Sequence, residues 1–284
     1  MKTKLSTSTK FVSLQILENN VAARAILIFT FLLLPFYFCL PTAKTQTPPA
    51  NRGVIRLKVK YKTGDLTKEL PRKRFFLIRG SLADNKPLIE KIKQIDVMSR
   101  ECYYRSHGAS EALINWLKEN DCDSIYCREI EAKYLTGSEA VPEFQAAYNQ
   151  GLREFKTPEL GRRWLAVNLP AEISDSFYKR KQEIIDALIK QSEDATRTKV
   201  MSVMTDHKGT AYLTDIEPGT YTITNLIGSE TAKTSILWAC EKEVKAVDLA
   251  VAMRRPFTLS NENDPKVKCE IVERPLPACE KTLK

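Results

Sequence analysis

The chain has 284 residues, of which 43% are hydrophobic and 28% are charged, and its formal net charge is +9. These values are those of an ordinary globular protein, which excludes a wholly disordered chain. The length is sufficient for one large domain or two small ones.

The first 43 residues form a targeting segment rather than part of the globule. Four basic residues precede an uncharged apolar run over residues 25–43, as in an export signal. The run is also close to the roughly 20 residues that a membrane-spanning helix needs. Both a cleaved signal and an uncleaved anchor therefore remain open. In either case the basic residues retain the N-terminus in the cytoplasm, so we expect the remainder to be exported, periplasmic or at the cell surface.

A proline-containing linker, residues 44–52, leads into a strongly alternating stretch over residues 54–62. Alternation with period two predicts a half-buried strand. Its predicted inner face carries Ile55, Leu57, Val59 and Tyr61, and its outer face carries Arg56, Lys58, Lys60 and Lys62. Residues 74–79 are more apolar and predict a second, more central strand.

The pattern changes to helical spacing from residue 85. Helices are predicted over residues 86–105, 110–119, 124–135, 141–155 and 172–192. We therefore assign residues 85–198 to a helical block.

Strand patterning returns at residue 199 and continues through residue 224, with further strands predicted over residues 232–238 and 244–253. Two strands alone cannot bury a face stably. We therefore expect residues 53–84 and 199–255 to form one β-sandwich, with the helical block inserted in a loop. The alternative is a helical domain followed by an independent β domain. The tail, residues 256–284, is rich in proline and is predicted to be irregular.

Two turns carry the most specific motif of the chain. Asp206 and Gly209 form a D-x-x-G hairpin, and Pro218, Gly219 and Tyr221 form a Pro-Gly-x-Tyr turn before the next strand. Together with the order of the strands, these residues resemble the carboxypeptidase regulatory-like domain family.

The resemblance implies an α+β chain built on a seven-stranded, antiparallel, transthyretin-like β-sandwich, with the helical insertion between its second and third strands. This family occurs on exported bacterial proteins, and its domain is not itself catalytic. The resemblance therefore implies an adaptor, surface or binding role, and the long insertion departs from the short loop that is usual in the family.

Six cysteines remain outside the apolar segment: Cys102, Cys122, Cys127, Cys240, Cys269 and Cys279. An even count in an exported chain predicts disulfides. The spacing of Cys122 and Cys127 fits neither a zinc site nor a redox pair, and a structural bridge between them is favoured over a redox role. Because the helical block and the β part hold three cysteines each, at least one disulfide should join them.

The shortest loop between two of these cysteines in the β part would be closed by a Cys269–Cys279 bridge. A bridge from Cys102 to Cys122 or Cys127 would come next, which would leave Cys240 joined to the remaining helical cysteine.

Ten basic and only two acidic residues lie between residues 52 and 83. The outer-face side chains Arg56, Lys58, Lys60 and Lys62 are candidate contacts for an anionic glycan or lipid surface. The alternative is an edge strand whose lysines prevent sheet-to-sheet aggregation. A nucleic-acid partner is not expected in an exported chain that lacks aromatic residues interleaved with the basic ones.

No sequence motif for catalysis, metal binding or a cofactor is present, and both histidines lie outside any such context. We therefore expect a non-enzymatic exported binding or scaffolding module with an unknown protein partner. The alternatives are a polyanion or carbohydrate binder acting through the basic hairpin, and a hydrolase seated in the helical insertion.

Overall fold

The computed structural model describes residues 52–165, 168–169, 176–231, 233–246, 251, 254–262 and 264–279. Residues 50–284 belong to one structural unit. The predicted targeting segment, residues 1–43, and nearly all of the linker lie outside the described residues. Among the helices that are described, none combines the length and the apolar character needed to cross a bilayer.

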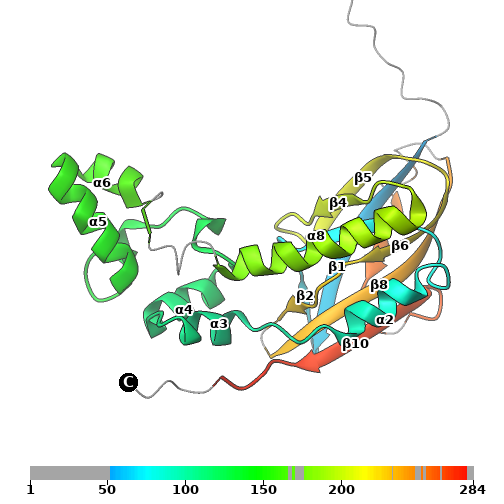
Figure 1. The fold of residues 1–284 in the computed structure, drawn as a ribbon, viewed down its shortest axis with the longest axis horizontal. Helices are drawn as coiled ribbons and strands as arrows, with labels where there is room; N and C mark the ends of the chain where they lie inside the picture. Colours follow the sequence, from blue (N-terminus) through cyan, green and yellow to red (C-terminus); the bar gives the residue numbers. More distant parts are fainter. Residues whose placement is uncertain are drawn as a thin grey trace, which may run out of the picture. The chain divides into compact units, whose positions relative to one another are not determined.

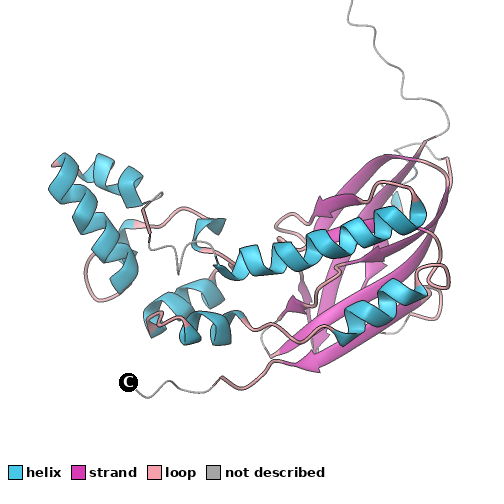
Figure 2. Cartoon of the chain, viewed as in Figure 1, coloured by secondary structure: helices cyan, strands magenta, loops and turns pink. Residues whose placement is uncertain are grey.

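The strands form two sheets (Figures 1 and 2). The four-stranded sheet consists of β1 (Gly53–Thr63), β2 (Leu66–Glu69), β5 (Thr210–Ile216) and β9 (Phe257–Leu259). The six-stranded sheet has the order β10 (Cys269–Pro275), β8 (Thr234–Val244), β6 (Gly219–Thr224), β3 (Arg74–Arg79) and β4 (Met201–Met204), with β7 (Ser229–Glu230) also paired to β8.

Strands from before and after the helical block pair with each other. β1 pairs with β5, and β3 pairs with β4 and β6, all antiparallel. Strands β1 and β3 are therefore each completed by strands more than 120 residues further on. The described residues thus contain a β-sandwich and helices, and the sandwich includes both β segments.

The core of the sandwich lies between the two sheets. The alternation of β1 buries Ile55, Leu57 and Val59, which pack in one cluster with Phe75 of β3 and Trp238 of β8. Leaving such side chains exposed would cost about 1.5–3 kcal/mol each, so this cluster dictates which face of β1 is turned inward.

The opposite face of the six-stranded sheet is covered by two helices, α2 (Lys86–Gln94) and α8 (Ser176–Thr196) (Figure 2). Phe76 and Ile78 of β3 pack there against residues of both helices, including Ile92 and Leu188. Because β3 is covered on both faces, it reads in the sequence as a nearly continuous apolar run.

A second core belongs to the helical block. It is built by α3 (Arg100–Ser106), α4 (Glu111–Glu119), the 3₁₀ turns η1 (Ile125–Cys127) and η2 (Ala132–Tyr134), and α5 (Pro142–Phe155), with α6 (Pro158–Leu165) packed on α5. Tyr104, Trp116 and Phe144 are buried in it, and Phe177 of α8 joins them. Helix α8 therefore contributes to both the helical core and the helix-covered face of the sheet.

Serine side chains start the short helices of this block. Ser99 and Ser110 accept hydrogen bonds from the backbone N–H groups of Cys102 and Leu113, and Ser124 caps the first 3₁₀ turn in the same way. Each cap satisfies a backbone donor that the helix itself leaves unpaired.

Several sequence expectations need correction. The described residues contain ten strands rather than seven. The tail is not irregular, since it supplies β9 and β10. Residues 124–135 form two 3₁₀ turns instead of one helix. Strand β8 ends at Val244, and most of the strand expected over residues 244–253 lies outside the described residues.

Candidate functional site

The motif residues of the two turns build the fold and provide no chemistry. The Asp206 carboxylate accepts hydrogen bonds from the N–H groups of Lys208 and Thr210, both at 2.8 Å. Gly209 has φ +64°, and a Cβ there would lie 2.5 Å from the carbonyl oxygen of Val59. At the second turn, beyond Pro218 and Gly219, the Tyr221 hydroxyl donates to the carbonyl of Glu217 at 2.8 Å.

The basic outer face of β1 is partly neutralised within the chain. Lys58 pairs with Glu69 and also donates to the Lys208 carbonyl at 2.5 Å. Lys62 pairs with Glu262 at 2.8 Å, and this hydrogen bond lowers the pKa of the Glu262 carboxyl. Lys60 lines a cleft described below, and Arg56 lines a second pocket.

The edge-strand explanation does not hold for Lys58. β1 is flanked by β5 on one side and by β9 on the other, and residues 57 and 58 pair with both. A strand that is paired on both sides has no free edge to protect.

The six cysteines form three disulfides: Cys102–Cys279, Cys122–Cys127 and Cys240–Cys269. The first joins the helical block to the tail, so one bridge does connect the two parts. The expected Cys269–Cys279 bridge is wrong, because Cys269 lies directly opposite Cys240 in the pairing of β10 with β8. The expected bridge from Cys102 to Cys122 or Cys127 is also wrong.

Where helical block and sandwich meet, charged side chains gather around the loop Asn120–Asp123, in which Cys122 forms a disulfide with Cys127. We call this set the junction cluster; it consists of Arg72, Lys73, Arg100, Asp121, Asp123, Lys181 and Glu230.

Cations of the junction cluster bond to this loop from three elements. The Lys73 ammonium, just before β3, lies 2.8 Å from both carboxylate oxygens of Asp121. Arg100 of α3 is buried and donates to the Cys122 carbonyl at 2.8 Å. Lys181 of α8 donates to Asp123 at 2.6 Å. These contacts fix the helical block against β3 through charge-assisted hydrogen bonds.

Two carboxyl groups of the junction cluster have pKa values shifted in opposite directions. Burial raises the pKa of Asp123, but the positive charges of Lys181 and Lys73 outweigh burial and lower it to about 2. For Glu230, burial raises the pKa and the nearby Arg100 offsets this only in part. The guanidinium of Arg100 is 3.9 Å from Glu230, which is long for an ion pair, so burial prevails.

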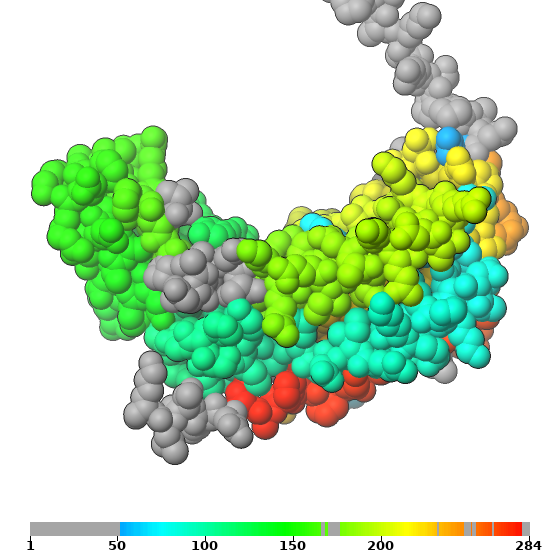
Figure 3. All heavy atoms as spheres, in the orientation of Figure 1, coloured from blue at the N-terminus to red at the C-terminus, as the bar shows by residue number. Residues whose placement is uncertain are grey.

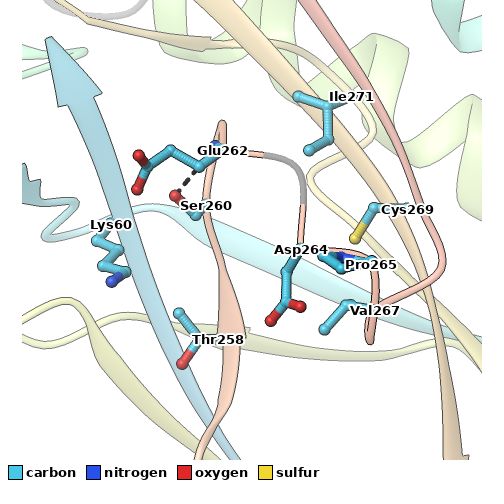
Figure 4. A pocket seen from close by; sticks show the side chains of 9 residues that line it. All are labelled: Lys60, Thr258, Ser260, Glu262, Asp264, Pro265, Val267, Cys269 and Ile271. Carbon is cyan, nitrogen blue, oxygen red and sulfur yellow. Dashed lines mark hydrogen bonds between the residues drawn. The ribbon is translucent and has the colours of Figure 1, made fainter. Parts of the chain in front are cut away.

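A cleft of about 500 Å³, which we call the edge cleft, opens between β9 and β10 (Figure 4). Its lining residues are Lys60, Thr258, Ser260, Glu262, Asp264, Pro265, Val267, Cys269 and Ile271.

The edge cleft combines one apolar wall with a polar rim. Figure 4 shows Ile271 and Cys269 projecting from β10 on one side, opposite Lys60 of β1. The intervening loop is held in place because Trp238 donates its indole N–H to the Ser260 carbonyl at 3.0 Å. Hydroxyl, carboxylate and ammonium groups beside an apolar wall can bind a polar, hydrogen-bonding ligand.

Within the part of the chain that is described, no cluster of three or more metal-binding side chains occurs. His107 stacks on Tyr103 with ring centroids 4.1 Å apart, and its Nδ1 lies 2.7 Å from the Tyr103 carbonyl. His207 lies in the exposed Asp206–Gly209 turn.

Comparison with known proteins gives little. No protein-family model matches the chain, and no curated protein matches it. The solved pilus backbone RrgB of Streptococcus pneumoniae is similar over 75% of this chain and 41% of its own length, with 10% identity and a TM-score of 0.24. The chain thus spans less than half of that protein, and a likeness this distant supports no functional assignment.

Sequence reasoning missed the junction cluster and the edge cleft. The cluster had a signal in the basic run Arg72-Lys73-Arg74 and the acidic pair around Cys122, but their pairing across 48 residues is a tertiary property. No sequence pattern pointed to the edge cleft, because its walls come mainly from the tail, which was predicted to be irregular.

Proposed function

We propose that this chain is an exported, non-enzymatic binding and scaffolding module that takes an extended segment of a protein partner in the edge cleft. Its three disulfides support an oxidising, extracytoplasmic environment. The junction cluster and the Cys102–Cys279 bridge support a scaffold in which helical block and sandwich act together.

The observation that carries the proposal is the position of the edge cleft between two strand edges. β9 pairs only with β1, and β10 pairs only with β8, among the described residues. Each strand therefore retains backbone N–H and C=O groups that an added strand can use. The cleft side chains would then select the partner, with Asp264 favouring a basic residue.

The test is photo-crosslinking in the native cells. A photoreactive amino acid replaces Thr258 in the cleft, and a control variant carries it at Thr214, which is exposed on β5. We expect a protein adduct from position 258, recovered with the cell envelope, and none from position 214. Equal labelling at both positions would refute the cleft as the binding site.

The same preparation tests export independently. Non-reducing peptide mapping should return the three disulfides from an extracytoplasmic fraction. Recovery of the chain from the cytoplasm with free thiols would contradict the exported module, whatever the crosslinking shows. The hydrolase alternative stays a prediction, which panels of ester and peptide substrates would check.

In the polyanion alternative, the ligand has to compete with carboxylates of the chain for the same lysine side chains. Lys58 and Lys62 already have carboxylate partners, and a surface ion pair contributes at most about 1 kcal/mol, so competition is feasible but weakens binding. Charge reversal of Lys60 should abolish salt-sensitive binding to an acidic glycan if the basic hairpin binds it, and an unchanged affinity would rule the hairpin out.

A further inference from the structure

A second pocket, distinct from the edge cleft, has an excess of positive charge. Its volume is about 340 Å³, and we call it the basic pocket. It is lined by Val54, Ile55, Arg56, Lys242, Glu243, Val244, Lys245, Val251, Arg255 and Phe257. Four of these residues are cationic and one is acidic.

Lys242 occupies a position in β8 that belongs to the sandwich interior. The residues two before and two after it, Cys240 and Val244, are 0% and 4% exposed and belong to the core between the sheets. Because side chains alternate along a strand, Lys242 points to the same side. The Lys242 side chain is half-buried at this position, and lysine is rarely found inside a protein unless it is paired.

The surroundings of Lys242 compensate its charge only weakly. Its ammonium lies 5.3 Å from the centre of the Phe257 ring, a cation–π contact. No carboxylate among the described residues bonds to it. The acidic residue of the pocket, Glu243, instead pairs with Lys245 at 3.5 Å, and both of these side chains are exposed.

Arg255 adds a second cation that no described carboxylate neutralises, and it is exposed at the pocket. Arg56 has its own partner within the chain and is not needed for the argument. The pocket therefore presents one inward-facing ammonium and one guanidinium around an apolar surface.

The walls of the basic pocket are held close together by the start of β1. A Cβ at Gly53 would lie 2.3 Å from Val244 Cγ1 and 2.8 Å from the Lys245 carbonyl oxygen. Glycine at this position lets β1 approach the end of β8, so the cationic side chains are placed on a preformed surface.

We propose that the basic pocket binds a phosphate group. A phosphate supplies the counter-charge that Lys242 lacks, and its oxygens accept bidentate hydrogen bonds from the Arg255 guanidinium. The phosphate comes either from a free small molecule or from a lipid headgroup. This proposal does not depend on the edge cleft.

The test compares thermal unfolding of the exported chain in phosphate and in chloride of equal ionic strength. Lys242→Met keeps the length and apolar stem of the side chain and removes the charge. Arg255→Gln, at an exposed position, is a second variant that leaves the core untouched. Lys199→Met, at an exposed lysine outside the pocket, is the matched control.

We expect phosphate to raise the Tm of the wild type and of the Lys199→Met control by about 2–4 °C at concentrations several times the Kd. The rise should vanish in Lys242→Met and shrink in Arg255→Gln. An equal rise in all four proteins, or none in the wild type, would overturn the proposal. If Lys242→Met does not fold, a rise in the Tm of Arg255→Gln as large as that of the wild type would likewise overturn the proposal.

A second arm identifies the source of the phosphate. Vesicles of phosphatidylglycerol and of phosphatidylcholine are sedimented with each protein. Binding to phosphatidylglycerol that weakens at least about tenfold in Lys242→Met indicates a headgroup. A phosphate-dependent Tm without vesicle binding indicates a free ligand. Vesicle binding that is unchanged in Lys242→Met counts against the pocket.

Discussion

Asp123 shows how a single half-buried carboxylate makes stability depend on pH. Its pKa of about 2 in the folded protein is below the roughly 3.9 of an unfolded chain, because Lys181 and Lys73 stabilise the charged form. A depressed carboxyl pKa adds stability above the unfolded value and loses it as the pH falls through the folded one. The shift corresponds to on the order of 2 kcal/mol, lost between about pH 4 and pH 2.

We therefore expect Asp123→Asn to lower the free energy of unfolding at pH 7 by about 2 kcal/mol and to reduce the loss of stability between pH 4 and pH 2. Urea unfolding at pH 7, pH 4 and pH 2 measures both effects. The control is Glu159→Gln, which removes an exposed ion pair to Arg163 and should have little effect. Identical pH profiles of Asp123→Asn and the wild type would contradict the assignment.

Glu230 should make stability depend on pH in the direction opposite to that of Asp123. Burial raises its pKa, so its contribution to stability is present at low pH and declines as the pH rises above the unfolded value of about 4.3. Glu230→Gln keeps an acceptor for the N–H of Arg100 but carries no charge. As the pH rises from 4 to 8, the variant should lose less stability than the wild type. A larger loss in the variant would show that the pairing with Arg100 outweighs burial.

At the scale of elements, α5 and α6 cross where both helices carry glycine. A Cβ at Gly151 would lie 2.7 Å from Trp164 Cβ, whereas a Cβ at Gly161 would meet mainly the Tyr148 ring and the end of Leu152, at 3.0 Å or more. The Gly151 contact is with the root of a side chain that cannot turn away. The Gly161 contacts are with atoms that can shift.

Gly151→Ala should therefore destabilise the protein by about 1–3 kcal/mol, although alanine favours an isolated helix. Gly161→Ala should cost less. Asn149→Ala, at an exposed position of the same helix, serves as the control and should be neutral or slightly stabilising. Chemical denaturation ranks the three variants, and a stabilising Gly151→Ala would exclude a tight crossing.

Helices and strands that follow from a local sequence pattern could be predicted, whereas those that depend on tertiary context could not. The alternation of β1 and the apolar run of β3 are local patterns, and the sequence predicts both strands and their pairing with the later strands correctly. β10 ends in Pro275, which an edge strand tolerates, so the prolines of the tail were a misleading sign of irregular structure. The helical spacing over residues 124–135 was misleading, since this segment forms two short 3₁₀ turns, the first of them inside the loop that the Cys122–Cys127 bridge closes.

The candidate sites are less predictable than the fold, because they depend on register and tertiary contact. Cys240 meets Cys269 only through the pairing of β8 with β10. Lys242 is recognised as inward-facing only once its neighbours Cys240 and Val244 are known to be buried. The charge of the basic hairpin was visible in the sequence, but the carboxylates that neutralise part of it come from β2 and from residue 262.

At the scale of the whole molecule, the disulfides differ in how much chain they constrain. Cys102–Cys279 spans a sequence separation of 177 residues, whereas Cys122–Cys127 spans five. Loss of a long-loop bridge typically costs about 2–5 kcal/mol, because the unfolded chain regains more freedom. The double variant Cys102→Ser/Cys279→Ser should therefore have a lower Tm than the wild type. Its decrease in Tm should exceed the decrease that the chain-entropy effect predicts for loss of the short Cys122–Cys127 bridge.

Differential scanning calorimetry of the double variant, with and without reductant, measures this contribution. Reductant should shift the Tm of the wild type further than that of the variant, because the variant has already lost the long bridge. Equal shifts in both would show that the bridge contributes nothing to the unfolding equilibrium.

Because the helical block interrupts the sandwich, the strands that pair with each other are synthesised at widely separated times. β3 ends at residue 79 and its first strand partner, β4, begins at residue 201. During synthesis from the N-terminus, β1 and β3 therefore emerge long before the strands that complete them. Contacts this distant give a high contact order and slow folding, on the millisecond-to-second scale of non-local β proteins. Until β5 and β6 are made, the apolar side chains of the two nascent strands remain open to aggregation, so we expect folding of this protein to depend on a chaperone that holds unpaired strands.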